Sequence, residues 1–187
     1  MKRLITVLTV ACVVAGTVGV VWLAGCNGGS ADRPRAPKAQ AYVCENCGHK
    51  FGVPNTMPVK QRPFPPIVCP KCGKQAAVRA YLYAPKGGGD PVIYKYEKYT
   101  DKQIDAMVKY RDETPIEQLE FEDPETIVSA GGDSSLIKYA DEDKWFNPAR
   151  EPEKDRPFTE MQKRFKSIIP VFPKDWPVEK PENLKQR

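Results

Sequence analysis

Apolar residues follow three different patterns along the chain, and each pattern predicts a different kind of segment. Residues 4–25 form an apolar run without a single charge. Between residues 41 and 98, short runs of β-branched, aromatic and small residues are separated by glycine and proline, which is typical of strands and turns. Beyond residue 98, two stretches carry apolar residues at helical spacing, while prolines and charges interrupt the remainder.

The clearest strand pair is predicted on either side of a glycine-rich turn. Residues 76–83 and 92–96 have the composition of strands, and the sequence Pro-Lys-Gly-Gly-Gly-Asp-Pro lies between them. No Lys-Ser/Thr pair follows the glycines, so they are predicted to form a turn and not a phosphate-binding loop. Alternation places two sets of side chains each on one face of its strand: Val78, Ala80 and Leu82, and Val92, Tyr94 and Tyr96.

Two helices are predicted from capping signatures. Thr100 and Gln103 have the spacing of a capping box, which favours a helix over residues 101–112 with an apolar stripe packed on the sheet. Thr159 and Gln162 repeat the signature, and a second short helix is expected near residues 160–169. The two stripes comprise Ile104, Met107, Val108 and Arg111, and Met161, Phe165 and Ile168.

The N-terminus has the pattern of an export signal. Met1-Lys2-Arg3 is basic and the apolar run follows it, which predicts a signal peptide over residues 1–25. The run ends Leu23-Ala24-Gly25-Cys26, which resembles the lipobox of bacterial lipoproteins. That resemblance implies cleavage before Cys26 and attachment of fatty acyl chains such as palmitate to its thiol.

An uncleaved transmembrane helix is the alternative, because about 20 apolar residues can span a bilayer. Gly16, Thr17 and Gly19 make the run rich in small residues, which favours the lipoprotein. Either way, we expect the rest of the chain to be held in the cell envelope, facing the periplasm or the exterior. Residues 26–40 have the composition of a linker, and Asn27 leaves open whether the inner or the outer membrane holds the anchor.

Four of the six cysteines form two Cys-x-x-Cys pairs, each followed by a glycine. This spacing lets a tight turn present both sulfurs to one ion, and the glycine permits the positive φ with which the chain leaves the turn. Residues 48–68, 21 in all, separate the pairs, close to the spacing in four-cysteine zinc sites. The predicted metal ligands are Cys44, Cys47, Cys69 and Cys72.

Residues 41–84 resemble the small zinc ribbons of bacterial regulatory proteins, in which Cys-x-x-Cys-Gly-x-x-Phe-x-Val precedes Cys-Pro-x-Cys-Gly. The stretch from Cys44 to Val53 matches the first half of that pattern. The segment also resembles rubredoxin, where equivalent turns hold a redox-active iron. Rubredoxins are acidic, whereas residues 41–86 carry seven basic residues against Glu45 alone, a net charge of +6. We therefore expect zinc, with iron as the alternative cofactor.

Other uses of these cysteines fit the pattern less well. An exported location permits disulfides, but a Cys-x-x-Cys disulfide closes a very small loop and does not require the repeated glycines. A redox-catalytic Cys-x-x-Cys comes singly, in a βαβ context. Haem attachment needs a histidine where this chain has Gly48. His49, the only histidine, is expected to face solvent and not to bind the metal.

Composition limits the size of the core. The 187 residues include 19 prolines, 28% are charged, and the mean hydropathy is −0.53, so little apolar surface offsets the entropy of ordering the chain. We expect a small α+β fold: a zinc-ribbon sheet extended by the hairpin over residues 41–98, a helix at 99–113, and a Pro-rich, weakly structured arm at 114–187.

The two parts of the chain differ in charge, and this difference bears on partners. Residues 87–187 contain 22 acidic and 17 basic residues, a net charge of −5. An arm that lies across the basic ribbon and an arm that meets a partner's basic face both remain open. The aromatic residues that would anchor the arm are Trp145, Phe146, Phe172 and Trp176.

No catalytic pattern is present in the sequence. A Ser-His-Asp set, His-Glu-x-x-His and Gly-x-Ser-x-Gly are all absent, and the carboxylates are scattered. We therefore expect a non-enzymatic module for protein interaction or scaffolding, attached to the membrane through Cys26 and bound to a protein partner in the envelope. Electron transfer by an iron centre is the alternative. No small-molecule substrate is indicated, and export argues against a nucleic-acid partner.

Overall fold

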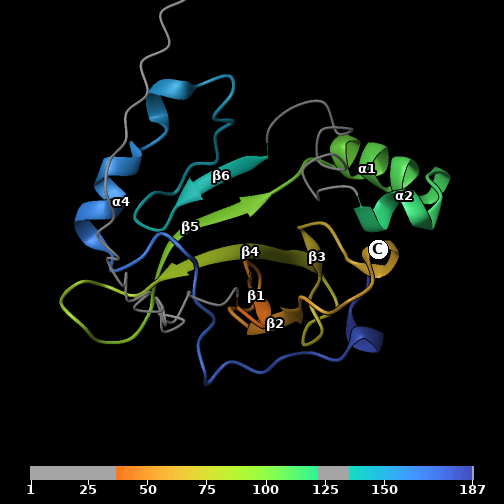
Figure 1. The fold of residues 1–187 in the computed structure, drawn as a ribbon, viewed down its shortest axis with the longest axis horizontal. Coiled ribbons are helices and arrows are strands. Elements are labelled where there is room, and N and C mark those ends of the chain that lie inside the picture. Colours follow the sequence, from red (N-terminus) through yellow and green to blue (C-terminus); the bar gives the residue numbers. More distant parts are fainter. Residues whose placement is uncertain (1–36, 122–134, 187) are drawn as a thin grey trace, which may run out of the picture. The chain divides into compact units, whose positions relative to one another are not determined.

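The computed structural model describes residues 37–121 and 135–186, which belong to one compact unit. The predicted signal at 1–25, Cys26 and most of the linker lie outside the described residues. In the described part, six strands form one antiparallel sheet with short helices beside it (Figure 1). The expected small α+β fold is confirmed.

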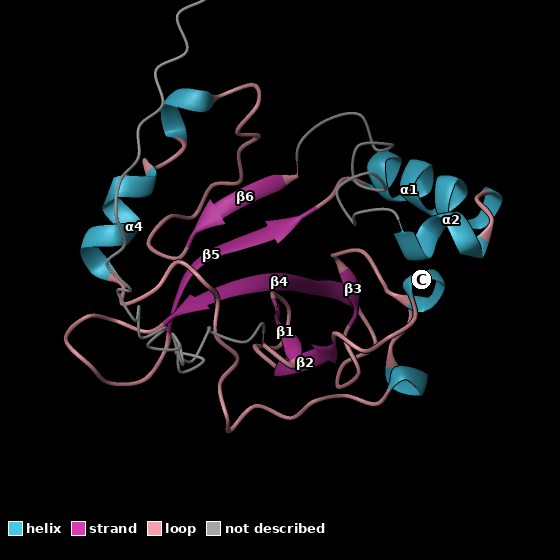
Figure 2. Cartoon of the chain, viewed as in Figure 1, coloured by secondary structure: helices cyan, strands magenta, loops and turns pink. Residues whose placement is uncertain are grey.

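The order of the strands places both cysteine turns at one end of the sheet. Strands β1 and β4 pair at its centre, β1 ends at Cys44, and β4 begins shortly after Cys72. The order is β2-β1-β4-β5-β6, and β3 pairs with the first residues of β4 (Figure 2). The strands are β1 (Ala39–Cys44), β2 (Lys50–Pro54), β3 (Ile67–Val68), β4 (Gln75–Tyr83), β5 (Val92–Lys98) and β6 (Leu136–Tyr139).

The predicted hairpin is formed by β4 and β5, but a β-bulge changes which side chains share a face. Ala80 pairs with Tyr96 whereas Leu82 pairs with Ile93, so Tyr94 is an extra residue in β5. Tyr94 therefore packs in an aromatic cluster on one face, and Tyr96 packs beside Ala80 and Leu82 on the other. The expectation that Val92, Tyr94 and Tyr96 share a face is wrong, because one inserted residue reverses the alternation.

Helix α1 (Asp101–Glu113) begins at the predicted capping box. The Thr100 side chain accepts from the Gln103 amide, and the Gln103 side chain accepts from the Thr100 amide at 2.9 Å. Its apolar stripe does not pack on the sheet as expected. Ile104 and Met107 instead form a cluster with Leu119 of α2 (Ile116–Phe121), against Val59 and Phe64 of the loop between the cysteine turns. That loop supplies apolar side chains of its own, including Val59 at the start of the 3₁₀ helix η1 (Val59–Gln61).

Helix α4 (Phe158–Arg164) differs from the predicted second helix. It begins after Pro157, without a side-chain cap, and ends before Phe165, which has extended backbone angles. The expected cap at Thr159 and the continuation to residue 169 are therefore wrong. Phe165 leaves the helix because its ring is buried between Tyr83 and Tyr94 on the sheet.

The C-terminal arm docks on the sheet of its own chain, a question that the sequence left open. β6 adds a strand beside β5, and Phe146 exchanges backbone hydrogen bonds with Ile137 along the outer edge of β6. At the opposite edge, the Gly52 amide of β2 donates to the Pro177 carbonyl at 2.7 Å, and the Glu179 amide donates to the Gly52 carbonyl at 2.9 Å. The 3₁₀ helices η2 (Pro152–Lys154) and η3 (Pro181–Asn183) lie in this arm. Each edge strand of the sheet is thus bonded to the arm at one residue, which hinders pairing with other chains.

Gly52 is required where the arm crosses β2. A Cβ atom there would lie 2.6 Å from Cζ of Phe172. We expect Gly52→Ala to lower the free energy of unfolding by about 1–3 kcal/mol, because the Phe172 ring must move off the sheet. Gly87→Ala is the matched control, since nothing lies within 4 Å of a Cβ at that turn position. Urea denaturation measures both, and equal stability of the two variants would contradict this packing.

A buried carboxylate joins β4, β5 and β6. Glu97 accepts from Arg79 Nη1 at 2.9 Å, from the Tyr81 hydroxyl at 2.7 Å and from the Ser135 hydroxyl at 2.7 Å. Burial by itself would raise the pKa of Glu97, but the Arg79 charge and the hydrogen bonds from Ser135 and Tyr81 outweigh it and hold the pKa below 4.5.

Because the pKa of Glu97 is lower in the folded protein than in the unfolded chain, its ionised form stabilises the fold above pH 4.5, and this stability is lost as pH falls through the folded pKa. We expect Glu97→Gln to flatten the acid side of the stability profile. Denaturant titrations between pH 7 and pH 3 test this. Glu113→Gln, at an exposed position of α1, is the control. A pH profile for Glu97→Gln that matches wild type would count against the network.

Candidate metal centre

Two copies of one backbone turn hold the four cysteines. In the first turn, the Gly48 amide donates to the Cys44 carbonyl at 2.9 Å, and the Cys44 amide donates to the His49 carbonyl at 2.9 Å. In the second turn, the equivalent bonds join Gly73 to Cys69 at 2.9 Å and Cys69 to Lys74 at 2.8 Å. Gly48 and Gly73 have φ values of +68° and +72°, where a side chain would be strained. The repeated sequence pattern thus folds into a repeated structure.

The four sulfur atoms converge on one point. They all lie within 4.8 Å of one another, with 3.7 Å between Cys44 and Cys72 and 3.8 Å between Cys47 and Cys69. A tetrahedral ion with metal–sulfur bonds of about 2.3 Å needs sulfurs about 3.8 Å apart, so the residues fit the ion. Disulfide bonds would need about 2.05 Å, and the four cysteines are free thiols. The predicted four-cysteine group can therefore hold one metal ion.

The centre has a buried side and an exposed side. Cys44 and Cys69 are almost completely buried, whereas Cys47 is exposed and Cys72 is intermediate. Burial raises the pKa of the Cys44 thiol to about 12 and also raises the pKa of Cys69. The Lys74 amide, by its hydrogen bond to sulfur, lowers the pKa of Cys72 to about 7. A cation between the sulfurs would supply the positive charge that the buried thiolates require.

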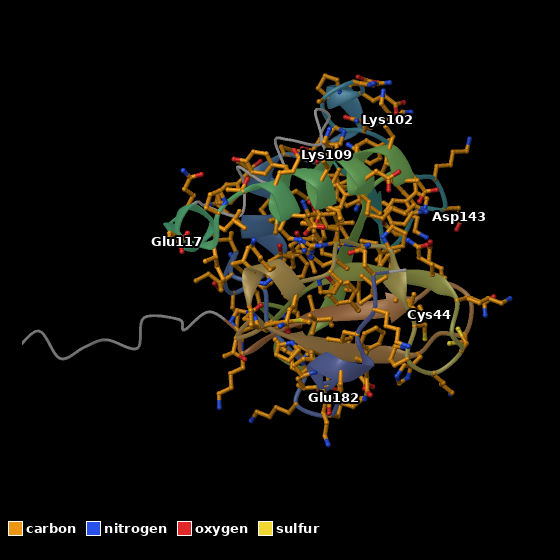
Figure 3. The ribbon with its side chains drawn as sticks, turned by 90° about the vertical axis from the view of Figure 1, so that its right-hand side faces the viewer. Cys44, Lys102, Lys109, Glu117, Asp143 and Glu182 are labelled. Carbon is orange, nitrogen blue, oxygen red and sulfur yellow. The ribbon has the colours of Figure 1, made fainter. Side chains whose placement is uncertain are left out.

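The buried cysteines belong to a hydrophobic cluster at the end of the sheet. Cys44 and Cys69 pack with Tyr42, Phe51 and Ile67, and the tyrosine and phenylalanine rings stack at 5.8 Å. Leu184 from the C-terminal arm completes this cluster. In Figure 3, Cys44 and Lys109 of α1 lie in different parts of the molecule. The metal site is thus part of a core, and not an isolated loop.

Charged side chains from other strands reach the first turn. Lys98 of β5 and Lys138 of β6 contact the Glu45 carboxylate at 3.3 and 3.1 Å. Burial opposes ionisation of Glu45, but the Lys138 hydrogen bond and the charges of both lysines outweigh it and lower its pKa. Since Glu45 is the only acidic residue in residues 41–86, this pairing neutralises the one negative side chain of the ribbon segment itself.

A polar chain joins the two turns across their exposed side. Lys74 of the second turn donates to Asn46 Oδ1 of the first at 3.0 Å, and Asn46 Nδ2 lies 3.8 Å from Cys72 Sγ. Sequence reasoning missed the roles of Asn46 and Lys138. The lone glutamate in a basic segment was the available signal for the lysine contact, whereas nothing in the sequence pointed to the asparagine.

His49 lies beside the centre but is not one of the four ligand residues grouped in the described part of the chain. Its ring stacks on Phe51 at 5.4 Å, and Nε2 lies 3.7 Å from a Glu179 carboxylate oxygen of the C-terminal arm. Its side chain is only 22% exposed, so the expectation that it faces solvent is wrong. The predicted lipidation site, Cys26, lies outside the described residues.

Comparisons with known proteins give no family for this chain. No protein-family model, no curated protein and no solved structure matches it. What can be said of the centre therefore comes from its own residues: four thiols placed as in a zinc ribbon, two of them in the core.

Removing one buried ligand should release the ion and unfold this end of the sheet. We expect Cys69→Ser to lose most of its metal and to lose the ordered structure of β1–β4, because three ligands leave the tetrahedron open and the core cluster loses its centre. Elemental analysis and circular dichroism measure the two effects. Lys71→Ser, an exposed change within the same turn, should preserve both. A Cys69→Ser variant that kept its metal and its structure would contradict the assignment.

Proposed function

We propose that this protein is a lipoprotein of the bacterial cell envelope, in which a structural zinc ion stabilises a non-enzymatic module for protein interaction or scaffolding. The observation that carries the proposal is the burial of Cys44 and Cys69 in the cluster with Tyr42 and Phe51. An ion held there fixes the core of a small domain. Four protein ligands also leave no open coordination position, as is usual in structural zinc sites.

The basic surroundings of the centre favour a loaded four-thiolate site, and their contrast with the acidic rubredoxins is the reason for proposing zinc and not iron. Four thiolates around a divalent ion carry a net charge of −2, which the excess of lysine and arginine in residues 41–86 offsets. Glu45, the one acidic residue there, is paired with two lysines. Exposed Cys47 is the feature that favours the alternative, a rubredoxin-like iron centre, because an electron could enter or leave through that ligand.

The exposed tips of the two turns support a protein-binding role. Residues 45–48 and residues 71, 73 and 74 are exposed. The turns combine a rigid backbone with lysine side chains, and a rigid surface binds a partner at little entropic cost.

The envelope location rests on the sequence of residues 1–26, with its basic start, apolar run and lipobox. Over residues 37–121 and 135–186, no helix has the length and hydrophobicity needed to cross a bilayer. The proposed attachment is through acyl chains on Cys26, because the apolar run ends in the lipobox, and a stable anchor needs more than one such chain.

One purification tests both parts of the proposal. The mature protein, extracted from membranes, should contain one zinc per chain, be colourless, and have the intact mass of a chain that begins at an acylated Cys26. Cys26→Ala should move the protein to the soluble fraction. Membrane retention of Cys26→Ala would favour the uncleaved helix. One iron per chain with visible colour would favour electron transfer, and a metal-free chain with two disulfides would overturn the metal centre.

A further inference from the structure

The start of the described chain and the C-terminal arm enclose an apolar groove. Its volume is 550 Å³, and the apolar residues that line it include Pro37, Ile169, Val171, Phe172, Trp176 and Val178. We call it the tether-side groove, because Pro37 is the first described residue and lies near the end of the predicted linker, residues 26–40. Phe172 and Trp176 are in edge-to-face contact, with ring centroids 6.3 Å apart. Val178, at one edge of the groove, is 50% exposed.

A second groove continues this apolar surface. It has a volume of 860 Å³ and shares Val171, Phe172 and Trp176 with the tether-side groove. It extends to Val92 at the start of β5, which is 43% exposed. Two adjoining apolar hollows that share one aromatic ridge form a contiguous patch, and such patches on soluble domains mark binding surfaces.

The charges of the groove are of one sign. Lys38 and Lys174 line it, and its lining contains no acidic side chain. In the second groove, Lys50 Nζ lies 5.6 Å from the centroid of the Trp176 ring. Asp90 and Asp175 also line that groove. Lysines around a tryptophan and aliphatic residues are the combination found where a protein surface meets the interface of an anionic bilayer.

The groove lies close, along the chain, to the predicted membrane anchor at Cys26. Residues 27–36 separate Cys26 from Pro37, and ten residues span at most about 35 Å. If Cys26 is acylated, as proposed above, the groove is the part of the described domain from which the tether leaves. The membrane surface is then always within reach of the groove.

We propose that the tether-side groove is a lipid-binding surface. It contacts the anionic phospholipids of the same membrane into which the acyl chains of Cys26 insert. The groove and the acyl chains would hold the domain at two points. The exposed cysteine turns would then have one orientation relative to the bilayer, which suits a module that presents a surface to a partner. This inference rests on the proposed lipid anchor.

Tryptophan fluorescence tests the groove in the full acylated chain. Trp22 is changed to Phe throughout, so that the signal does not depend on cleavage. With Trp145→Phe added, Trp176 in the groove is the single tryptophan. With Trp176→Phe added instead, Trp145 is the single tryptophan, and the centroid of its ring lies 4.0 Å from Lys98 Nζ of β5. In phosphatidylglycerol vesicles with lipids brominated near the headgroup end of the acyl chain, we expect roughly twofold quenching of Trp176 and little quenching of Trp145.

A matched pair of charge substitutions tests the apolar contact. Val178→Asp should weaken the quenching of Trp176, because it places a carboxylate in the groove. Ile116→Asp changes a residue of nearly equal exposure, 48%, on α2 and should leave the quenching unchanged. Metal content reports whether each variant is folded.

Absence of Trp176 quenching, or equal quenching of both tryptophans, would overturn the proposal. A groove filled by the protein's own acyl chains would give a blue-shifted Trp176 without quenching by the brominated lipids, which would also overturn it. Intact mass on the same sample reports acylation independently. An unacylated chain would refute the anchor, whereas an acylated chain without quenching would refute only the groove.

Discussion

The convergence of four sulfur atoms on one point is the constraint around which the described chain is built. Cys44 ends β1 and Cys72 precedes β4, so an ion held between the turns would fix the register and the spacing of the two central strands. The strands in turn place Tyr42 and Phe51 against the buried sulfurs. In a chain with 19 prolines and a modest apolar content, an ion that links distant segments can replace part of the hydrophobic stabilisation that a larger core would provide.

The C-terminal arm supplies the second source of order. Its apolar residues are too widely spaced to form a core by themselves, and several pack against the sheet: Phe146 and Phe165 with the tyrosines of β4 to β6, Phe172 over Gly52, and Leu184 beside the cysteines. The hydrophobic contacts are divided among several clusters. Loss of one arm contact should therefore disturb one cluster and leave the others largely intact.

Electrostatics link the two parts of the chain at specific positions and not as whole surfaces. The ribbon's single glutamate is bound by lysines from β5 and β6, and its histidine faces Glu179 of the arm. The proposed functions use the two surfaces that these contacts leave available. In these proposals, the exposed cysteine turns bind a protein partner and the tether-side groove contacts the membrane.

The sequence by itself determined the cysteine turns, the β4–β5 hairpin and helix α1, because each depends on local rules: ligand spacing, glycine at positive φ, and a capping box. It also supplied the whole case for the lipid anchor at Cys26. The short apolar run of β6, Leu136–Tyr139, was not predicted as a strand, and its alternating burial appears only in the structure. Only the tertiary structure decided the bulge at Tyr94, the early end of α4, the docking of the arm aromatics and the position of the groove. These depend on contacts between residues far apart in sequence, whose energies no local pattern specifies.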